Sequence, residues 1–140
     1  MKRDVRLRPL SRDHYHALVL ARFIGAICAR DGMDAQAVDV VRERFAAEIT
    51  PHFVIEETLL TALEGHGVDH LVKRTRDEHA MIEKLLEQAL AANTTCMCEL
   101  GELLIEHVRF EERELYPACE ELLSAETLDR IAAAHRSAAQ

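Results

Sequence analysis

Long segments with the periodicity of α-helices, separated by short turn signals, are the feature that most constrains the fold of this chain. Five glycines and three prolines are spread over 140 residues, and segments rich in Ala, Leu, Glu and Arg lie between them. Apolar residues recur in these segments every three or four positions rather than every second position, which favours helix over strand. The sequence therefore predicts an all-α protein.

Turn and capping residues divide the helical sequence into four long helices and a short one. Ser11 is a good N-cap for the first helix, and Asp31-Gly32 is a stop signal after it. Pro51 predicts a kink inside the second helix, and Pro117 predicts a bend or break in the fourth. Ser124 is expected to cap the C-terminal helix. The predicted ranges are 11–29, 34–64, 69–92, a fourth helix from the turn at 93–95 to about 123, and about 125–137.

Short connections between long helices determine the expected topology. Helices joined by short loops pack antiparallel to their chain neighbours, which predicts an up-down-up-down four-helix bundle with a short C-terminal fifth helix. The apolar content of 49% and the length suit one ordinary core. No linker or low-complexity stretch divides the chain. We therefore predict one domain over residues 1–140, with the bundle at about 11–123.

The charge distribution argues against several classes of partner. The net charge is -8, so a nucleic acid or an anionic membrane is not an expected partner. The first ten residues carry five charged side chains, unlike a secretory signal, and the longest apolar stretch, 17–29, is too short to span a membrane. A cytoplasmic location is predicted. Four scattered cysteines lie at positions 28, 96, 98 and 119. We expect all four to be reduced and chemically inert, including the Cys96-Met-Cys98 pair.

A repeated motif is the most informative local feature. His52-Phe-Val-Ile-Glu56-Glu57 in the second predicted helix has the same H-x-x-x-E-E pattern as His107-Val-Arg-Phe-Glu111-Glu112 in the fourth. A spacing of four places the imidazole and the first carboxylate on one helix face, where both reach one metal ion. The two helices are diagonal and parallel in the predicted bundle. The motifs are therefore expected to face each other and to form a dinuclear pocket.

The other two helices supply the remaining histidine candidates. His79 is the natural donor from the third helix, since it lies among apolar residues in an otherwise charged stretch. The first helix offers both His14 and His16. Helical spacing favours His16, which continues into the apolar stripe, whereas His14 remains an alternative ligand with His16 outside the coordination sphere. The predicted metal ligands are thus His52, Glu56, His79, His107, Glu111 and either His14 or His16.

Other polar residues near the motifs are expected to lie outside direct coordination. Glu57 and Glu112 point about 100° away from the preceding glutamates, so they either support ligands or carry surface charge. Tyr15 and Tyr116 lie near the motifs, and packing alone explains either of them. Solvent exposure is expected for three further histidines: His66, His70 and His135.

These motifs resemble the hemerythrin-like, HHE-type cation-binding domain over nearly the whole chain. The pieces that carry the resemblance are the segment around His14 and His16, Pro51-His52-Phe-x-x-Glu56-Glu57, Asp77-Glu-His79 and 107–117. The resemblance implies an up-down bundle with two iron ions joined by an oxo or hydroxo bridge and by carboxylates. It also implies interaction with dioxygen, peroxide or nitric oxide. Manganese or zinc suits the same donors.

One departure from the family pattern bears on function. Oxygen-carrying hemerythrins have two histidines four residues apart on the third helix, whereas this chain has Thr75 before His79 and Glu83 after it. Either Glu83 substitutes for the missing histidine or one metal keeps an open position for an exogenous ligand. Reversible oxygen carriage is therefore less expected than sensing or reaction.

The sequence leaves three functions to compare. The leading interpretation is a di-iron protein that binds, senses or reacts with dioxygen, peroxide or nitric oxide. The second is a metal reservoir without turnover, which would bind metal without a ligand-dependent spectral change. The third is a metal-free helical module with an acidic surface for a basic protein partner. Strong stabilisation by added metal is expected only if the histidines and glutamates form a metal site.

Overall fold

The computed structural model describes residues 2–30 and 33–138, and all regular secondary structure in these ranges is helical. Two of the four long helices contain a short π-helical segment, η1 and η2, so each is named in three parts. The elements are α1 (Arg8–Ala29), α2 (Ala35–Arg44), η1 (Phe45–Ile49), α3 (Thr50–Leu63), α4 (Asp69–Leu90), α5 (Thr94–Phe110), η2 (Glu111–Leu115), α6 (Tyr116–Leu122) and α7 (Ala125–Ala138).

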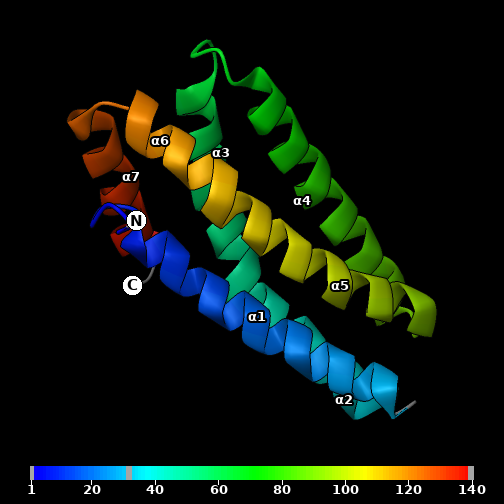
Figure 1. Cartoon of the computed structure of the whole chain (residues 1–140). Helices are drawn as coiled ribbons and strands as arrows, with labels where there is room; N and C mark the ends of the chain where they lie inside the picture. Colours follow the sequence, from blue (N-terminus) through cyan, green and yellow to red (C-terminus); the bar gives the residue numbers. More distant parts are fainter. Residues whose placement is uncertain (1, 31–32, 139–140) are drawn as a thin grey trace.

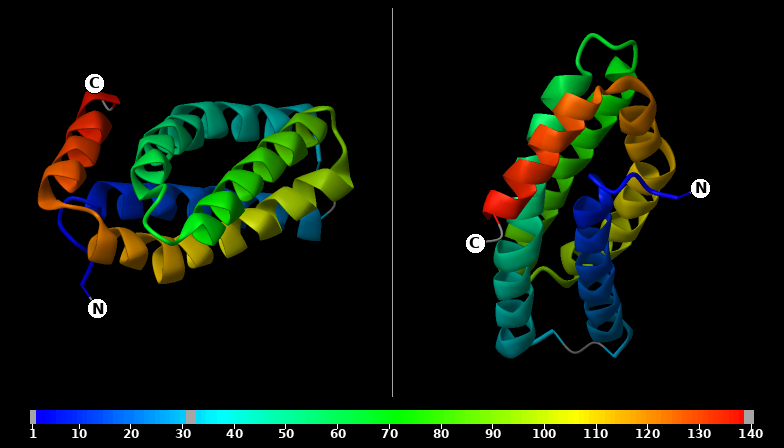
Figure 2. Two further views of the ribbon diagram at one scale, coloured as in Figure 1. Left: turned by 90° about the horizontal axis from the view of Figure 1, so that it is seen from above. Right: turned by 90° about the vertical axis from the view of Figure 1, so that its left-hand side faces the viewer.

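The long helices form the predicted up-down-up-down bundle (Figure 1). α5 packs along both α1 and α4, while the α2–η1–α3 helix contacts α1 and α4 on the other side. The two helices that carry the repeated motif are therefore diagonal, as predicted. α7 lies against α3 at the end of the bundle where the chain begins (Figure 2). This arrangement brings one helix face from each of the four long helices to a common centre.

The helix starts agree with the capping residues except at α1. The side chains of Asp34 and Asn93 accept hydrogen bonds from backbone N–H groups in the first turns of α2 and α5, and Ser124 does the same for α7. The predicted start of the first helix at Ser11 is wrong, because α1 begins at Arg8 with a proline in its first turn. Ser11 lies inside the helix. The Asp31-Gly32 stop signal falls outside the described residues.

The two predicted irregularities are π-helical turns. η1 ends immediately before Thr50-Pro51, and η2 ends immediately before Tyr116-Pro117. A proline has no N–H for the preceding turn, and its ring collides with the carbonyl four residues earlier, so a wider turn before it relieves both defects. Each π-turn lies beside one copy of the repeated motif. These turns therefore set the angles at which the motif side chains point into the bundle.

The apolar core has two parts with a polar layer between them. One part contains Leu10, Leu60 and Phe110 and lies towards α7, whereas the other contains Leu20 and Ile82 and lies towards the α1–α2 turn. Seven buried polar side chains of the described residues lie along the chain between these apolar segments, in every long helix: His14, His52, Glu56, Thr75, His79, His107 and Glu111. The sequence thus builds a dry shell on both sides of a central polar cluster.

The prediction that all cysteines are reduced is wrong for two of them. Cys28 near the end of α1 and Cys98 near the start of α5 form a disulfide, with their Cα atoms 5.9 Å apart. α1 and α5 approach closely here, since a Cβ added to Gly101 would lie 2.9 Å from the Ile24 side chain. Cys96 and Cys119 are free. Disulfides persist mainly in oxidising surroundings, so this bond argues against the predicted cytoplasmic location. The location itself stays a prediction.

None of the helices within the described ranges combines the length and apolarity that crossing a membrane requires.

Candidate metal centre

Six of the predicted ligands converge at the centre of the bundle. His14 comes from α1, His52 and Glu56 from α3, His79 from α4, His107 from α5 and Glu111 from the first residue of η2. Both glutamates are fully buried, and the four histidines are 2–8% exposed. The spacing of four in each H-x-x-x-E motif brings Nε2 of His52 to 3.2 Å from Glu56 and Nε2 of His107 to 3.1 Å from Glu111.

The preference for His16 over His14 was wrong, because only His14 faces this cluster. His14 Nε2 lies 2.8 Å from Glu111 Oε1, whereas His16 is exposed. Residues two positions apart on a helix point about 200° apart, so both cannot face the centre. The apolar stripe of α1 runs through Leu10, His14, Ala17 and Ala21 and centres on the His14 side.

The cluster consists of two groups of four that share both glutamates. His14 and His52 with the glutamates form one group, and His79 and His107 with the same glutamates form the other. In each group the potential ligand atoms lie within 4.8 Å of one another. A carboxylate has two oxygens and bridges two cations, whereas an imidazole presents one lone pair to one cation. The arrangement thus offers two possible cation positions with Glu56 and Glu111 in common.

Carboxylates outside the cluster hold the outer nitrogens of three of these histidines. Nδ1 of His14 lies 2.7 Å from Glu112, Nδ1 of His52 lies 2.9 Å from Asp13, and Nδ1 of His107 lies 2.7 Å from Glu78. An Nδ1–H that donates to a carboxylate leaves Nε2 to face the cluster and fixes the ring orientation.

Of these outer carboxylates, the sequence analysis named only Glu112 as a possible support for a ligand, which its contact with His14 confirms, and it missed Asp13 and Glu78. Asp13, Glu78 and Glu112 are each the immediate neighbour of a cluster residue, yet each contacts a histidine of another helix. In the sequence, the only indication of these supporting acids was that each one stands beside a candidate metal ligand. The partner of each acid depends on how the helices pack, which the sequence did not reveal.

His79 is oriented in a different way. Its ring stacks on Phe53 with centroids 3.9 Å apart and an interplanar angle of 18°, and within the described ranges no carboxylate is hydrogen-bonded to its Nδ1. Glu57, the acidic neighbour of Glu56, instead pairs with Arg76 at the surface, 2.7 Å away. The His79 side of the cluster therefore lacks the ionic brace that the other three histidines have.

Charge pairing dominates the protonation of the metal-free cluster. Burial alone would lower the pKa of His107, but the neighbouring carboxylates, chiefly Glu111, outweigh burial and raise it to about 10. The pKa values of His14, His52 and His79 rise for the same reason. Burial likewise opposes ionisation of Glu111, but the histidines prevail and hold its pKa well below the usual range. Without metal, the cluster is a network of imidazolium–carboxylate pairs.

Tyr116 adds a neutral donor to this network. Its hydroxyl donates to Glu56 Oε2 at 2.6 Å and lies 3.2 Å from His14 Nε2, and its ring stacks on His14 with an interplanar angle of 2°. Burial, reinforced by the negative charge of Glu56, raises its pKa well above the usual value, so the phenol keeps its proton. The phenol therefore orients one of the two shared carboxylates.

Several inward-facing atoms show that these residues suit a cation. His52 Nε2, His107 Nε2 and Glu111 Oε2 are buried and make no hydrogen bond to any described residue, although each lies within 3.2 Å of an oppositely charged group. A buried polar atom without a hydrogen bond is costly, whereas all three atom types are good ligands for a divalent transition metal. The four imidazoles and two carboxylates thus fit a metal cofactor in both charge and donor type.

The position of the missing histidine is not filled by a carboxylate. Thr75 lies one turn before His79, fully buried, and its hydroxyl donates to the Leu71 carbonyl at 2.8 Å. Glu83, the suggested substitute, is exposed and lies outside both groups of four. A hollow of about 320 Å³ reaches the same side and is lined in part by Phe53 and His79.

The expectation of solvent exposure holds for two of the three remaining histidines. His66 and His70 are exposed beside the α3–α4 turn. His135 is not, because α7 packs back over α1 and its Nε2 lies 2.8 Å from Asp13. Asp13 Oδ2 therefore contacts two imidazoles, those of His52 and His135.

In the comparison with known families, residues 10–119 match the hemerythrin HHE cation binding domain. This range begins within α1, ends within α6 and includes all six cluster residues, whereas α7 lies outside it. No curated protein and no solved structure gives a significant match.

Proposed function

Because the chain belongs to the hemerythrin HHE cation-binding family, we propose that its buried cluster holds two iron ions and binds, senses or reacts with dioxygen, peroxide or nitric oxide. The observation that carries this proposal is the sharing of Glu56 and Glu111 by both groups of four. Glu56 and Glu111 would hold both ions, because each belongs to both groups. His14 and His52 would hold one ion, and His79 and His107 would hold the other.

The donor set suits iron, one of several metals that the family name leaves open. Mixed imidazole and carboxylate ligands inside a helical bundle are typical of non-heme iron and manganese sites, and zinc accepts the same donors. Two adjacent irons supply electrons to, or accept them from, a small ligand at an open position. A metal reservoir needs no such open position. The difference between the two sides of the site therefore decides between a reservoir and a reactive or sensing centre.

That asymmetry supports a reactive or sensing role on the His79 side. The Thr75 hydroxyl is engaged with its own helix, and Glu83 is exposed and lies outside both groups of four, so an ion held by His79 and His107 would lack the second histidine that oxygen-carrying hemerythrins have on this helix. The hollow beside Phe53 and His79 offers an approach from solvent. An exogenous ligand is therefore expected to bind on this side.

The surrounding residues would control what happens at such a position. The apolar cores on both sides limit water, which strengthens the electrostatic interactions of a bound ligand. The carboxylates on His14, His52 and His107 keep three imidazoles aimed at the centre. The Tyr116 hydroxyl donates a hydrogen bond to Glu56 and so holds this shared carboxylate in place.

Metal analysis with optical spectroscopy tests the proposal. Protein purified in air is expected to contain two irons per chain with the near-ultraviolet absorption of an oxo-bridged diferric pair. Reduced anaerobically and then titrated with dioxygen, peroxide or nitric oxide, it should change its spectrum with at least one of them. Two irons without any such response would indicate a reservoir. No metal after anaerobic ferrous reconstitution would favour the metal-free module.

A further inference from the structure

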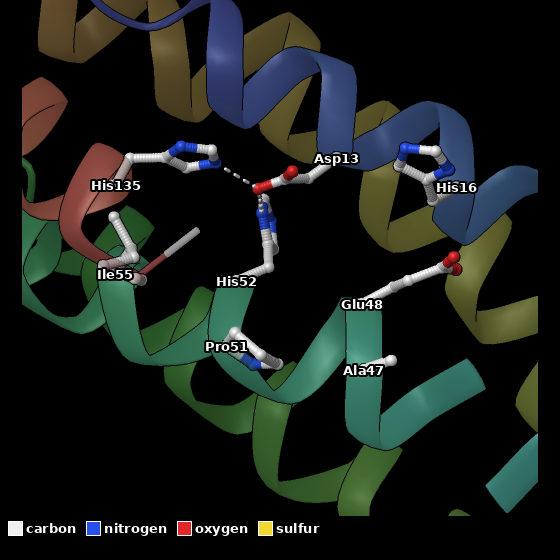
Figure 3. Close-up of a pocket in the computed structure, with 9 residues that line it drawn as sticks. Asp13, His16, Ala47, Glu48, Pro51, His52, Ile55 and His135 are labelled. Atoms are coloured by element: carbon white, nitrogen blue, oxygen red, sulfur yellow. Dashed lines mark hydrogen bonds and ion pairs between the residues drawn. The ribbon is translucent and has the colours of Figure 1, made fainter. Parts of the chain in front are cut away.

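A polar pocket lies directly outside the cluster, between α1, η1, the start of α3 and the end of α7. Its cavity volume is about 310 Å³. Figure 3 shows Asp13 with its two imidazole partners on one side of the pocket, while Glu48 reaches from η1 towards α1, where His16 lies. Two carboxylates and two further imidazoles thus surround one hollow: Asp13, Glu48, His16 and His135.

The inner wall of this pocket is formed by His52, which is also a candidate metal ligand of the buried centre. Of the six cluster residues, His52 alone is among the residues that line the pocket. Its Nδ1 faces Asp13 in the pocket, and its Nε2 faces Glu56 in the cluster. The pocket and the cluster are therefore separated by the thickness of one imidazole ring.

The pocket contains donors that the protein itself leaves free to bind a ligand. Glu48 Oε2 is buried and has no hydrogen-bond partner among the described residues, and the other oxygen of Glu48 lies 3.6 Å from Arg44. His16 is exposed and points away from the cluster. Imidazole and carboxylate are the donors that bind the first-row divalent metals. The same chemistry as in the cluster is thus present, in a looser and more accessible form.

We propose that this pocket is an outer cation site, at which a partly hydrated divalent transition-metal ion is captured before it passes His52 into the buried centre. The inference rests on the proposed function, since a capturing site serves a centre that takes up metal. The donors line the wall of the pocket instead of converging on one point, so the captured ion keeps water ligands and leaves easily. A site on a transport route must bind strongly enough to fill and weakly enough to empty.

The contacts of Asp13 provide the way past His52. One oxygen of Asp13 accepts from both His52 and His135. A cation in the pocket competes with both imidazoles for this carboxylate, and its arrival releases His52 Nδ1. The freed ring turns about its side-chain bonds and opens the wall. Once the ion has moved inward, Asp13 recovers His52 and holds its Nε2 towards the centre.

Rates of metal uptake test the outer site without relying on any activity of the loaded protein. Metal-free protein is mixed with Co²⁺ in a stopped-flow spectrophotometer, and the visible cobalt absorption reports arrival in the buried centre. The variant is His16→Ala/Glu48→Gln, which leaves the six cluster residues intact. The matched control is His66→Ala/Glu102→Gln, which removes one imidazole and one carboxylate from exposed positions elsewhere.

The variant is expected to load about 10-fold more slowly, because local charge and ligands raise the capture rate of a cation by roughly this factor or more. Its final cobalt content and spectrum should equal those of the wild type, and the control should load at the wild-type rate. His16→Ala alone, on an exposed side chain, should slow loading about threefold and guards against a folding defect in the double variant.

Two results would overturn the outer site. One is a loading rate of the double variant within twofold of the wild type, and the other is an equal slowing of variant and control. Either would leave the proposed buried centre intact. If the wild-type protein took up no cobalt and no iron, both the buried centre and the outer site would be wrong.

Discussion

Glu56→Gln tests the shared-carboxylate arrangement most directly, because Glu57 beside it provides a matched control. The Glu56 carboxylate is fully buried, accepts from Tyr116 at 2.6 Å, and lies 3.0 Å from His79 Nε2 and 3.2 Å from His52 Nε2. The Glu57 carboxylate is half exposed and pairs with a surface arginine. The same one-atom change is thus made in two adjacent residues with opposite surroundings.

The structure gives separate magnitudes for the metal-free and the metal-loaded protein. Without metal, Glu56→Gln removes one partner of a buried ionic network, which costs about 3 kcal/mol and lowers the melting temperature by about 10 °C in a chain of this size. Glu57→Gln removes an exposed ion pair that contributes about 0.5 kcal/mol. A metal that binds only the folded state adds about 4 kcal/mol at a free concentration 1,000 times its dissociation constant. Glu56→Gln should lose that increment, and Glu57→Gln should keep it.

Two measurements decide the outcome. Inductively coupled plasma analysis after ferrous reconstitution should find two irons per chain in the wild type and in Glu57→Gln, and fewer than one in Glu56→Gln, because both metal positions share Glu56. Thermal unfolding followed by circular dichroism, with and without metal, should separate the two stability terms. Equal iron content and equal melting temperatures for the two variants would refute the assignment of Glu56 as a bridging ligand.

Three further predictions follow from the same contacts. The raised pKa of His107 stabilises the metal-free protein fully below about pH 6.5, and this stabilisation is lost as the pH rises towards 10, by up to about 1.4 kcal/mol per pH unit; the raised pKa values of His14, His52 and His79 act in the same direction. A melting temperature that rose from pH 6 to pH 9 would contradict this. Tyr116→Phe should cost about 2 kcal/mol through the lost bond to Glu56 while both metals remain, whereas Tyr15→Phe, at an exposed position, should change neither stability nor metal content. Cys28→Ser should lower stability by about 4 kcal/mol, since the Cys28–Cys98 disulfide closes a 70-residue separation; unchanged unfolding with and without a reductant would exclude the bond.

Local patterns predicted the helices and most of the cluster because they depend on residues close in the chain. The pairing of His52 with Glu56, repeated at His107 and Glu111, could be predicted from a spacing of four residues on one helix face. The caps at Asp34 and Asn93 are likewise local. Ser11 was misjudged because its hydroxyl donates to Glu112, 101 residues away, and does not cap α1.

Features that depend on how the helices pack could not be predicted from these local patterns. His14 and His16 both continue into apolar residues of α1, and the choice between them depends on which face meets η2, where Glu111 and Glu112 engage both ring nitrogens of His14. The disulfide needed α1 and α5 to be neighbours in space. The contact of His135 with Asp13 spans 122 residues and depends on α7 folding back over the bundle.

The cross-bracing of the cluster explains how one fold keeps a charged centre both buried and ready for metal. Each of the three outer acids lies beside a cluster residue on its own helix and holds a histidine of another helix. A shift of a helix that carries such an acid would therefore displace cluster residues of two helices at once. In the metal-free state, protons on the histidines neutralise the two buried glutamates, and the same outer bonds keep every braced ring in place when a metal displaces those protons. His79 is the exception, since Phe53 holds it by stacking and Glu57 is engaged with Arg76. The least constrained histidine thus lies on the Thr75 side of the cluster, where the proposed function expects an exogenous ligand to bind and where such a centre would need freedom to adjust.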